Sequence, residues 1–225
     1  PPRATGNEAF YALTEIAGKG DERAGEVLMT SAQVGFAASC IDSAPYGTRE
    51  GAAVEVCTHW LSNTLLWERL RTIGGAYGAF CNSEPMSGLL VFATYRDPTP
   101  LASSEAFSDC LKEASEIDFT EEECEAAVMG CYNHFIQPQS PKGRGSSALT
   151  RLLYGITDED RERKILGILE TKANDLKKAF ARLYENAKTS DKNAKMENFK
   201  KKSIITNEKS LKDAGFSGKI VNLPL

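Results

Sequence analysis

Two side chains of this sequence, Arg71 and Tyr77, have types and a spacing that could do chemistry. They lie six residues apart, on either side of a Gly-Gly pair. A guanidinium and a phenol both donate hydrogen bonds, and two such donors held at a tight bend could converge on one carbonyl oxygen and stabilise negative charge on it. Each also has a simpler alternative: Arg71 could form an ion pair with Glu68 or interact with a helix C-terminus, and Tyr77 could pack as an ordinary strand aromatic.

The elements around these residues are a predicted helix, a tight turn and a strand pair. An apolar stripe with helical spacing favours a helix over residues 48–71. Gly74 and Gly75 follow, and glycine tolerates the left-handed backbone in which helices commonly end. Strands are expected over residues 76–83 and 89–95, because the loop between them contains proline and glycine. The glycine turn would therefore set the two candidate residues on opposite sides of one bend.

The remaining pattern alternates between strands and helices. Apolar and polar residues alternate over residues 27–41, which predicts one long strand. Other predicted elements are helices at 103–115, after a capping box at Thr120 and over 158–184 as a single long helix, and strands at 203–206 and 219–223. This order predicts an α+β fold, with one antiparallel sheet of about five or six strands and helices packed on one face. Residues 1–24 are polar and Gly/Pro-rich and predict a linker or arm, which leaves 25–225 as the domain.

Composition excludes several classes of function. The net charge of −4 disfavours nucleic-acid binding, and no apolar run reaches the ~18 residues of a membrane span. None of the six cysteines forms a CxxC motif, so we expect buried free thiols and a reducing compartment. The chain begins with Pro1 and not with methionine, which favours part of a longer protein or a trimmed chain.

A catalytic metal site is not expected within this chain. A zinc hydrolase uses three protein ligands and a base carboxylate near the bound water. The only histidines are His59 and His134, and neither lies in a His-x-x-Glu-His or His-Glu-x-x-His motif. Glu55 lies one helical turn before His59, but a third ligand at helical spacing is absent. We therefore predict no metal ligands and no cofactor-binding residues here.

The segment LWERLRTIGGAYGAF, followed by FATYRDP, resembles the presequence-protease branch of the pitrilysin/insulinase superfamily of inverted-motif zinc metallopeptidases. Two later segments, PKGRGSSALTRLLYG and ITDEDRERKILGIL, resemble the segments that come next in this family. The resemblance covers about residues 27–183. It implies a metallopeptidase-repeat domain, like those of mitochondrial processing peptidases, and specifically the fourth repeat of a four-repeat clamshell whose N-terminal half holds the zinc.

The resemblance also implies roles for the two candidate residues. In the family, an arginine and a tyrosine of this repeat reach the substrate backbone at the zinc site, and they match Arg71 and Tyr77. We therefore expect the C-terminal domain of a metalloendopeptidase that degrades short unfolded peptides, inactive alone because its Zn²⁺ is bound by the absent N-terminal half. The implied partners are that N-terminal half and peptide substrates, in a monomeric full-length enzyme.

The expected location is a reducing compartment, either the cytoplasm or a mitochondrial or other organelle matrix. The alternative function is a non-catalytic structural or binding subunit of the same superfamily. A His-x-x-Glu-His motif upstream of Pro1 would distinguish the enzyme from this subunit.

Overall fold

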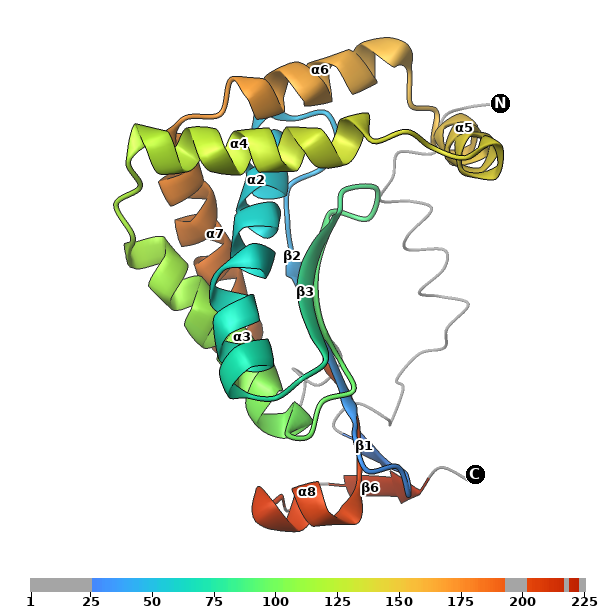
Figure 1. Cartoon of the computed structure of the whole chain (residues 1–225), viewed down its shortest axis with the longest axis vertical. Helices are drawn as coiled ribbons and strands as arrows, with labels where there is room; N and C mark the ends of the chain where they lie inside the picture. The colour runs from blue at the N-terminus through green and yellow to red at the C-terminus, as the bar shows by residue number, and fades with distance from the viewer. Residues whose placement is uncertain (1–25, 193–201, 217–218, 223–225) are drawn as a thin grey trace.

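A curved six-stranded sheet organises the part of the chain that the computed structural model describes, residues 26–192, 202–216 and 219–222 (Figure 1). The strand order is β3-β4-β2-β5-β1-β6. The strands are β1 (Glu26–Met29), β2 (Phe36–Asp42), β3 (Gly78–Glu84), β4 (Leu89–Tyr95), β5 (Lys202–Thr206) and β6 (Lys219–Asn222). The predicted arm over residues 1–24 lies outside the described residues.

The α+β class, the six strands and the strand pair after the glycine turn are confirmed, but the sheet is mixed and not purely antiparallel. β3, β4, β2 and β5 pair antiparallel, whereas β1 pairs parallel with both β5 and β6. The physical reason lies in residues 26–42, which fold back on themselves as β1 and β2. β5 lies between β1 and β2, which run in opposite directions, so it pairs parallel with β1 and antiparallel with β2. The prediction of one long strand over 27–41 is therefore wrong.

Helices follow the strands in the order that the sequence pattern predicts. They are α2 (Arg49–Asn63), the π-helix η1 (Trp67–Ile73), α3 (Pro100–Glu116), α4 (Glu121–Ile136), α5 (Pro141–Tyr154), α6 (Asp158–Leu169), α7 (Ala173–Lys192) and α8 (Glu208–Asp213). The prediction of one helix over residues 48–71 is wrong, because Thr64, with φ −120° and ψ −95°, departs from helical geometry and separates α2 from η1. The capping box at Thr120 is confirmed, because its hydroxyl accepts from the Glu123 amide and the Glu123 carboxylate accepts from the Thr120 amide. Thr48 caps α2 by accepting from Gly51 at 2.9 Å.

The single helix predicted over 158–184 is wrong, because the chain breaks between α6 and α7. The Thr171 hydroxyl donates to the Gly167 carbonyl at 2.8 Å, and the Asp175 carboxylate accepts from the Lys172 amide at 3.2 Å. These side-chain bonds offer the backbone an alternative to continuing the helix. The apolar stripe does not show the break, since Ile168 before it and Leu176 after it both lie in the same core.

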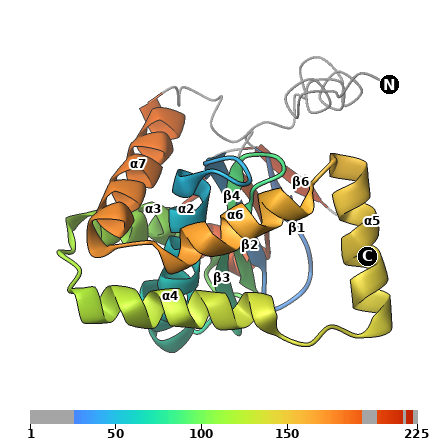
Figure 2. The same ribbon diagram turned by 90° about the horizontal axis from the view of Figure 1, so that it is seen from above.

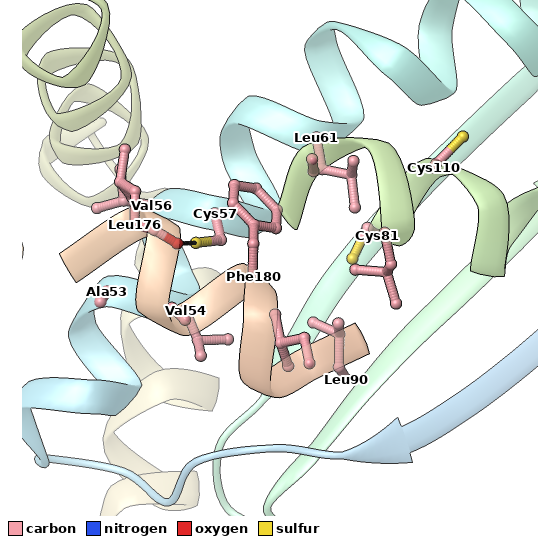
Figure 3. Close-up of a cluster of buried hydrophobic side chains, with 14 of the residues drawn as sticks. Ala53, Val54, Val56, Cys57, Leu61, Cys81, Leu90, Cys110, Leu176 and Phe180 are labelled. Atoms are coloured by element: carbon pink, nitrogen blue, oxygen red, sulfur yellow. Dashed lines mark hydrogen bonds between the residues drawn. The ribbon is translucent and has the colours of Figure 1, made fainter. Parts of the chain in front are cut away.

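The main core lies between the sheet and the helices α2, α3 and α7, which cover one face of it (Figures 1 and 2). Phe92 of β4 stacks on Phe107 of α3 with ring centroids 5.1 Å apart. The ring centroid of Phe180 in α7 lies 5.6 Å from that of Trp60 and 5.7 Å from that of Phe119. Phe180 is fully buried and is also surrounded by aliphatic side chains (Figure 3). These contacts join α3 to the sheet and α7 to α2, the helix that precedes η1 and Arg71 in the chain.

This packing predicts the effect of emptying the core. Replacing Phe180 with alanine should lower the free energy of unfolding by about 3–5 kcal/mol, because lost burial adds to the cost of a cavity. Urea denaturation followed by far-UV circular dichroism measures the change. Leu152→Ala on α5, where the side chain is 78% exposed, is the control and should stay within about ±0.5 kcal/mol. An equal loss in both variants would contradict the core assignment.

Candidate functional site

The bend between η1 and β3 is built from backbone hydrogen bonds around one left-handed position, Gly75. Gly75 has φ +78°, a left-handed conformation that costs glycine little and other residues more. The Gly75 amide donates to the Arg71 carbonyl at 3.2 Å, and the Ala76 amide donates to the Leu70 carbonyl at 2.9 Å. Ala76 is buried, so this bend is tied to the core. The predicted glycine turn is thus confirmed, with Gly75 as the residue that needs the left-handed backbone.

Arg71 lies in the last turn of η1 with its side chain exposed. Its guanidinium carbon lies 3.8 Å from the ring centroid of Trp67, which is a cation–π contact one turn back along the helix. Within the described residues, no ion pair between Arg71 and Glu68 is found. The stacked arrangement restricts the side chain while leaving its N–H donors available. The Glu68 alternative is therefore not supported, whereas the position of Arg71 in the last turn of η1 fits the alternative role at a helix C-terminus.

Tyr77 leads into β3 and is 67% exposed. Its amide donates to the Arg96 carbonyl at 3.3 Å, which joins the start of β3 to the end of β4. Its ring contacts Tyr95 edge to face with centroids 6.0 Å apart, so part of the strand-aromatic alternative is observed. No hydrogen bond of the Tyr77 hydroxyl is found in the described part of the chain. That Arg71 and Tyr77 act on one carbonyl stays a prediction.

The loop after β4 is held by a buried carboxylate. Asp97 is fully buried, and its Oδ1 accepts from the Thr99 amide at 2.8 Å. The backbone of Asp97 exchanges two hydrogen bonds with Gly35, at 2.7 and 2.9 Å. Arg96 takes φ +48°, a conformation uncommon outside glycine. Asp97 therefore has a structural role. It holds the backbone at the end of β4, where the Arg96 carbonyl accepts a hydrogen bond from the Tyr77 amide.

A separate polar cavity of about 400 Å³ brings the two histidines together. His59 of α2 and His134 of α4 both line it, beside Glu55 and Lys164. Burial lowers the pKa of His59, and the nearby His134 lowers it further. The Glu55 carboxylate is already paired and is not available as a metal ligand. It forms an ion pair with the Lys164 ammonium at 2.6 Å, and both side chains are only 12% exposed. Among the described residues, no group of three or more His, Cys, Asp or Glu side chains is arranged to hold a metal ion.

Five of the six cysteines are buried free thiols, namely Cys57, Cys81, Cys110, Cys124 and Cys131. Burial raises the pKa of Cys110 to about 11 and that of Cys131 to about 12. The Cys57 pKa is also well above its usual value, and its thiol donates to the Leu176 carbonyl at 3.8 Å (Figure 3). Thiols held neutral in this way are poor nucleophiles, so they pack as small apolar residues.

Two further exposed aromatics adjoin Tyr77 that the sequence reasoning did not select. Tyr95 ends β4, and Phe36 begins β2; their rings meet edge to face at 5.6 Å. Phe36 is distant from Tyr77 in sequence, and only the strand order and register bring it close. The alternation along β2 and β4 signals which face each ring is on, but not that the rings meet.

Comparison with known proteins settles the family. A family model described as the PreP C-terminal domain matches residues 26–202. The chain belongs to this family. Presequence protease 1 of chloroplasts and mitochondria from Arabidopsis thaliana is 37% identical over 128 residues, which is 57% of this chain and 12% of the relative. Mitochondrial presequence protease from Schizosaccharomyces pombe is 29% identical over 158 residues, 70% of this chain and 16% of the relative.

The fold agrees with that of the wider superfamily. The crystal structure of pitrilysin superposes on 81% of this PreP C-terminal domain with a TM-score of 0.52 at 14% identity, covering 19% of pitrilysin. At this identity the likeness establishes the fold alone. The domain spans less than a fifth of the length of each of these three proteins, so the activity of any whole enzyme is a matter of proposal.

The left-handed turn predicts a position-specific cost of adding a methyl group. Gly75→Ala should lower the free energy of unfolding by about 1–2 kcal/mol, because alanine is strained at positive φ. Gly145→Ala is the matched control: it lies within α5 with no atom near the added carbon, so alanine should be neutral or stabilising by up to about 1 kcal/mol. Thermal and urea unfolding would measure both. Equal effects would mean that the turn is not strained.

The metal expectation is tested on the purified chain. After removal of chelators and dialysis against micromolar zinc, elemental analysis should find far less than one zinc per chain, because the described residues hold no ligand set. Stoichiometric zinc that is lost in His59→Ala or His134→Ala would contradict this prediction and assign the metal to the polar cavity.

Proposed function

We propose that this chain is the C-terminal, substrate-clamping domain of a zinc metalloendopeptidase that degrades short unfolded peptides. The observation that carries the proposal is the match to the PreP C-terminal domain over residues 26–202, combined with an exposed arginine and tyrosine at the η1–β3 bend. The matched relatives from A. thaliana and S. pombe are named as presequence proteases. The family match over residues 26–202 includes the helix, bend and strands that hold Arg71 and Tyr77.

In the proposed mechanism, the two side chains act on the scissile carbonyl. As the carbonyl carbon becomes tetrahedral, its oxygen gains negative charge. The Arg71 guanidinium donates a charge-assisted hydrogen bond to that oxygen, and the Tyr77 hydroxyl donates a second, neutral one. Zinc held by residues outside this chain would supply the Lewis acid and the activated water. This domain would therefore contribute donors and peptide binding, and no metal ligand.

The surroundings of these donors support this role, because they restrict motion before substrate arrives. Stacking on Trp67 limits the rotamers of Arg71, and the bond from the Tyr77 amide to Arg96 fixes the start of β3. Donors already oriented need little reorganisation when charge develops, which is the source of most electrostatic catalysis. Their exposure leaves room for a peptide to approach.

Association with the N-terminal half of the same enzyme is supported by α5. Figures 1 and 2 show this helix at the margin of the molecule, and none of its residues is buried. Leu149, Leu152 and Leu153 on it are each more than half exposed. A contiguous apolar surface of this kind usually marks an interface. We propose that it packs against another domain of a monomeric full-length enzyme that encloses the substrate.

A mitochondrial or other organelle matrix is the proposed location. The names of the matched relatives place them in mitochondria and, in the plant, also in chloroplasts. Free thiols at the five buried cysteines fit a reducing compartment. None of the helices in the described ranges has the length and apolar character to cross a membrane.

The proposal predicts a loss of turnover without a loss of stability. In the full-length enzyme, Arg71→Ala and Tyr77→Phe should each lower kcat by about 100- to 1000-fold on a fluorogenic peptide, the usual effect of losing one oxyanion donor. Both sites are exposed, so the free energy of unfolding should change by no more than about 0.5 kcal/mol. Initial rates and melting temperature would be measured on the same preparations.

Matched controls separate a local from a general effect. Arg49→Ala removes an arginine whose side chain is 72% exposed, and Tyr154→Phe removes an exposed hydroxyl on α5. Both should retain normal turnover. Normal turnover in Arg71→Ala and Tyr77→Phe as well would favour the alternative function, a non-catalytic structural or binding subunit of the same superfamily.

A further inference from the structure

An aromatic row continues from Tyr77 across the end of the sheet. We define it as Tyr77, Tyr95 and Phe36, whose consecutive rings meet edge to face with centroids 6.0 and 5.6 Å apart. Tyr95 is 44% exposed and Phe36 is 37% exposed. The row thus presents ring surface to solvent beside one of the two proposed carbonyl donors.

The strand register places two of these rings, Phe36 and Tyr95, on the face of the sheet opposite the core. Ala37 and Thr94, the neighbours of Phe36 and Tyr95 along their strands, are buried on the helix-covered side, where the Ala37 amide donates to the Thr94 hydroxyl at 3.0 Å. Side chains alternate along a strand, so Phe36 and Tyr95 point the other way. Gly78 lies opposite Tyr95 and has no side chain, which leaves space for the Tyr77 ring to reach Tyr95.

Core packing does not account for the row. The core of the domain lies on the opposite face of β2 and β4, and the three rings are not part of the buried clusters. Edge-to-face pairs add only about 0.5–1.5 kcal/mol beyond the area that they bury. Much of the apolar ring surface remains in water, where a further apolar group would be bound favourably by covering it.

Charge around the row selects the kind of group that fits. The guanidinium carbon of Arg96 lies 5.8 Å from the Tyr95 ring centroid, and Arg71 lies over Trp67 nearby along the chain. The Arg96 guanidinium therefore already lies over the face of the Tyr95 ring, which is the part of an aromatic ring that attracts cations. A lysine or arginine of a peptide would meet like charge here. An apolar or aromatic side chain carries no charge that would have to be desolvated, and it can pack against the exposed parts of the Tyr95 and Phe36 rings.

We propose that Phe36 and Tyr95 form a specificity subsite that binds an apolar or aromatic side chain of the substrate, close to the peptide bond held by Arg71 and Tyr77. This inference rests on the proposed peptidase function. It adds a substrate preference and two residues that neither the sequence reasoning nor the family match assigns. Tyr77 would then serve twice, with its hydroxyl on the carbonyl and its ring at the edge of the subsite.

The test uses the full-length enzyme and a set of quenched fluorescent peptides with one sequence. Each peptide carries phenylalanine, leucine, alanine, lysine or glutamate at one of the positions flanking the cut, which mass spectrometry locates. The parent enzyme should prefer phenylalanine or leucine to alanine and lysine at one such position. Phe36→Ala, Tyr95→Ala and their double variant should reduce that preference in kcat/KM by about two- to tenfold, while the alanine peptide is cut at a nearly unchanged rate.

Tyr95→Phe is the matched control, because it keeps the ring and removes only the hydroxyl, so the preference should be retained. Equal loss of rate on every peptide in Phe36→Ala and Tyr95→Ala, or unchanged preferences in both, would overturn the subsite. Melting temperatures identify any variant that fails to fold, in which case Tyr95→Leu and Phe36→Leu replace the alanine variants. Failure of the peptidase proposal gives a different result, namely normal turnover of Arg71→Ala and Tyr77→Phe on all peptides.

Discussion

The left-handed turn at Gly75 is the constraint on which the rest of the site depends. It ends η1 and directs the chain into β3, the edge strand of the sheet. The bond from the Ala76 amide to the Leu70 carbonyl connects the turn to the core, because both residues are buried. These bonds fix the helix end relative to the strand start, so they hold the backbone positions from which the Arg71 and Tyr77 side chains project. A side chain at position 75 would strain the one backbone angle that joins them.

From this turn the sheet register places everything else near Tyr77. Pairing of Gly78 with Tyr95 brings the end of β4 alongside, and the fully buried Asp97 holds the following loop to Gly35. Gly35 immediately precedes β2, so the same link positions Phe36. The site is therefore formed by three segments far apart in sequence. Their alignment is determined by backbone hydrogen bonds, which orient side chains more precisely than mobile loops do.

Local sequence signals predicted the elements well and their long-range arrangement less well. The capping box at Thr120, the glycine turn and the β3–β4 strand pair involve residues close in the chain, and all are confirmed. The failures share one cause. Periodicity shows which residues share a face, but it does not show where β1 turns back into β2, or that Thr171 interrupts a continuous apolar stripe. Parallel pairing of β1 likewise depends on β5, a segment more than 150 residues later.

The division of chemistry within the domain follows from its two faces. The helix-covered side holds the five buried thiols, whose pKa values burial raises, and the Glu55–Lys164 ion pair. These groups are neutral or paired and take no part in the site. The other face and the η1–β3 bend hold exposed donors and aromatic rings. An arginine at position 71 suits this arrangement better than a lysine, since its planar guanidinium can stack on Trp67 and still direct N–H groups outward. A lysine would lose that stacking geometry, and with it the orientation that makes a donor effective before charge develops.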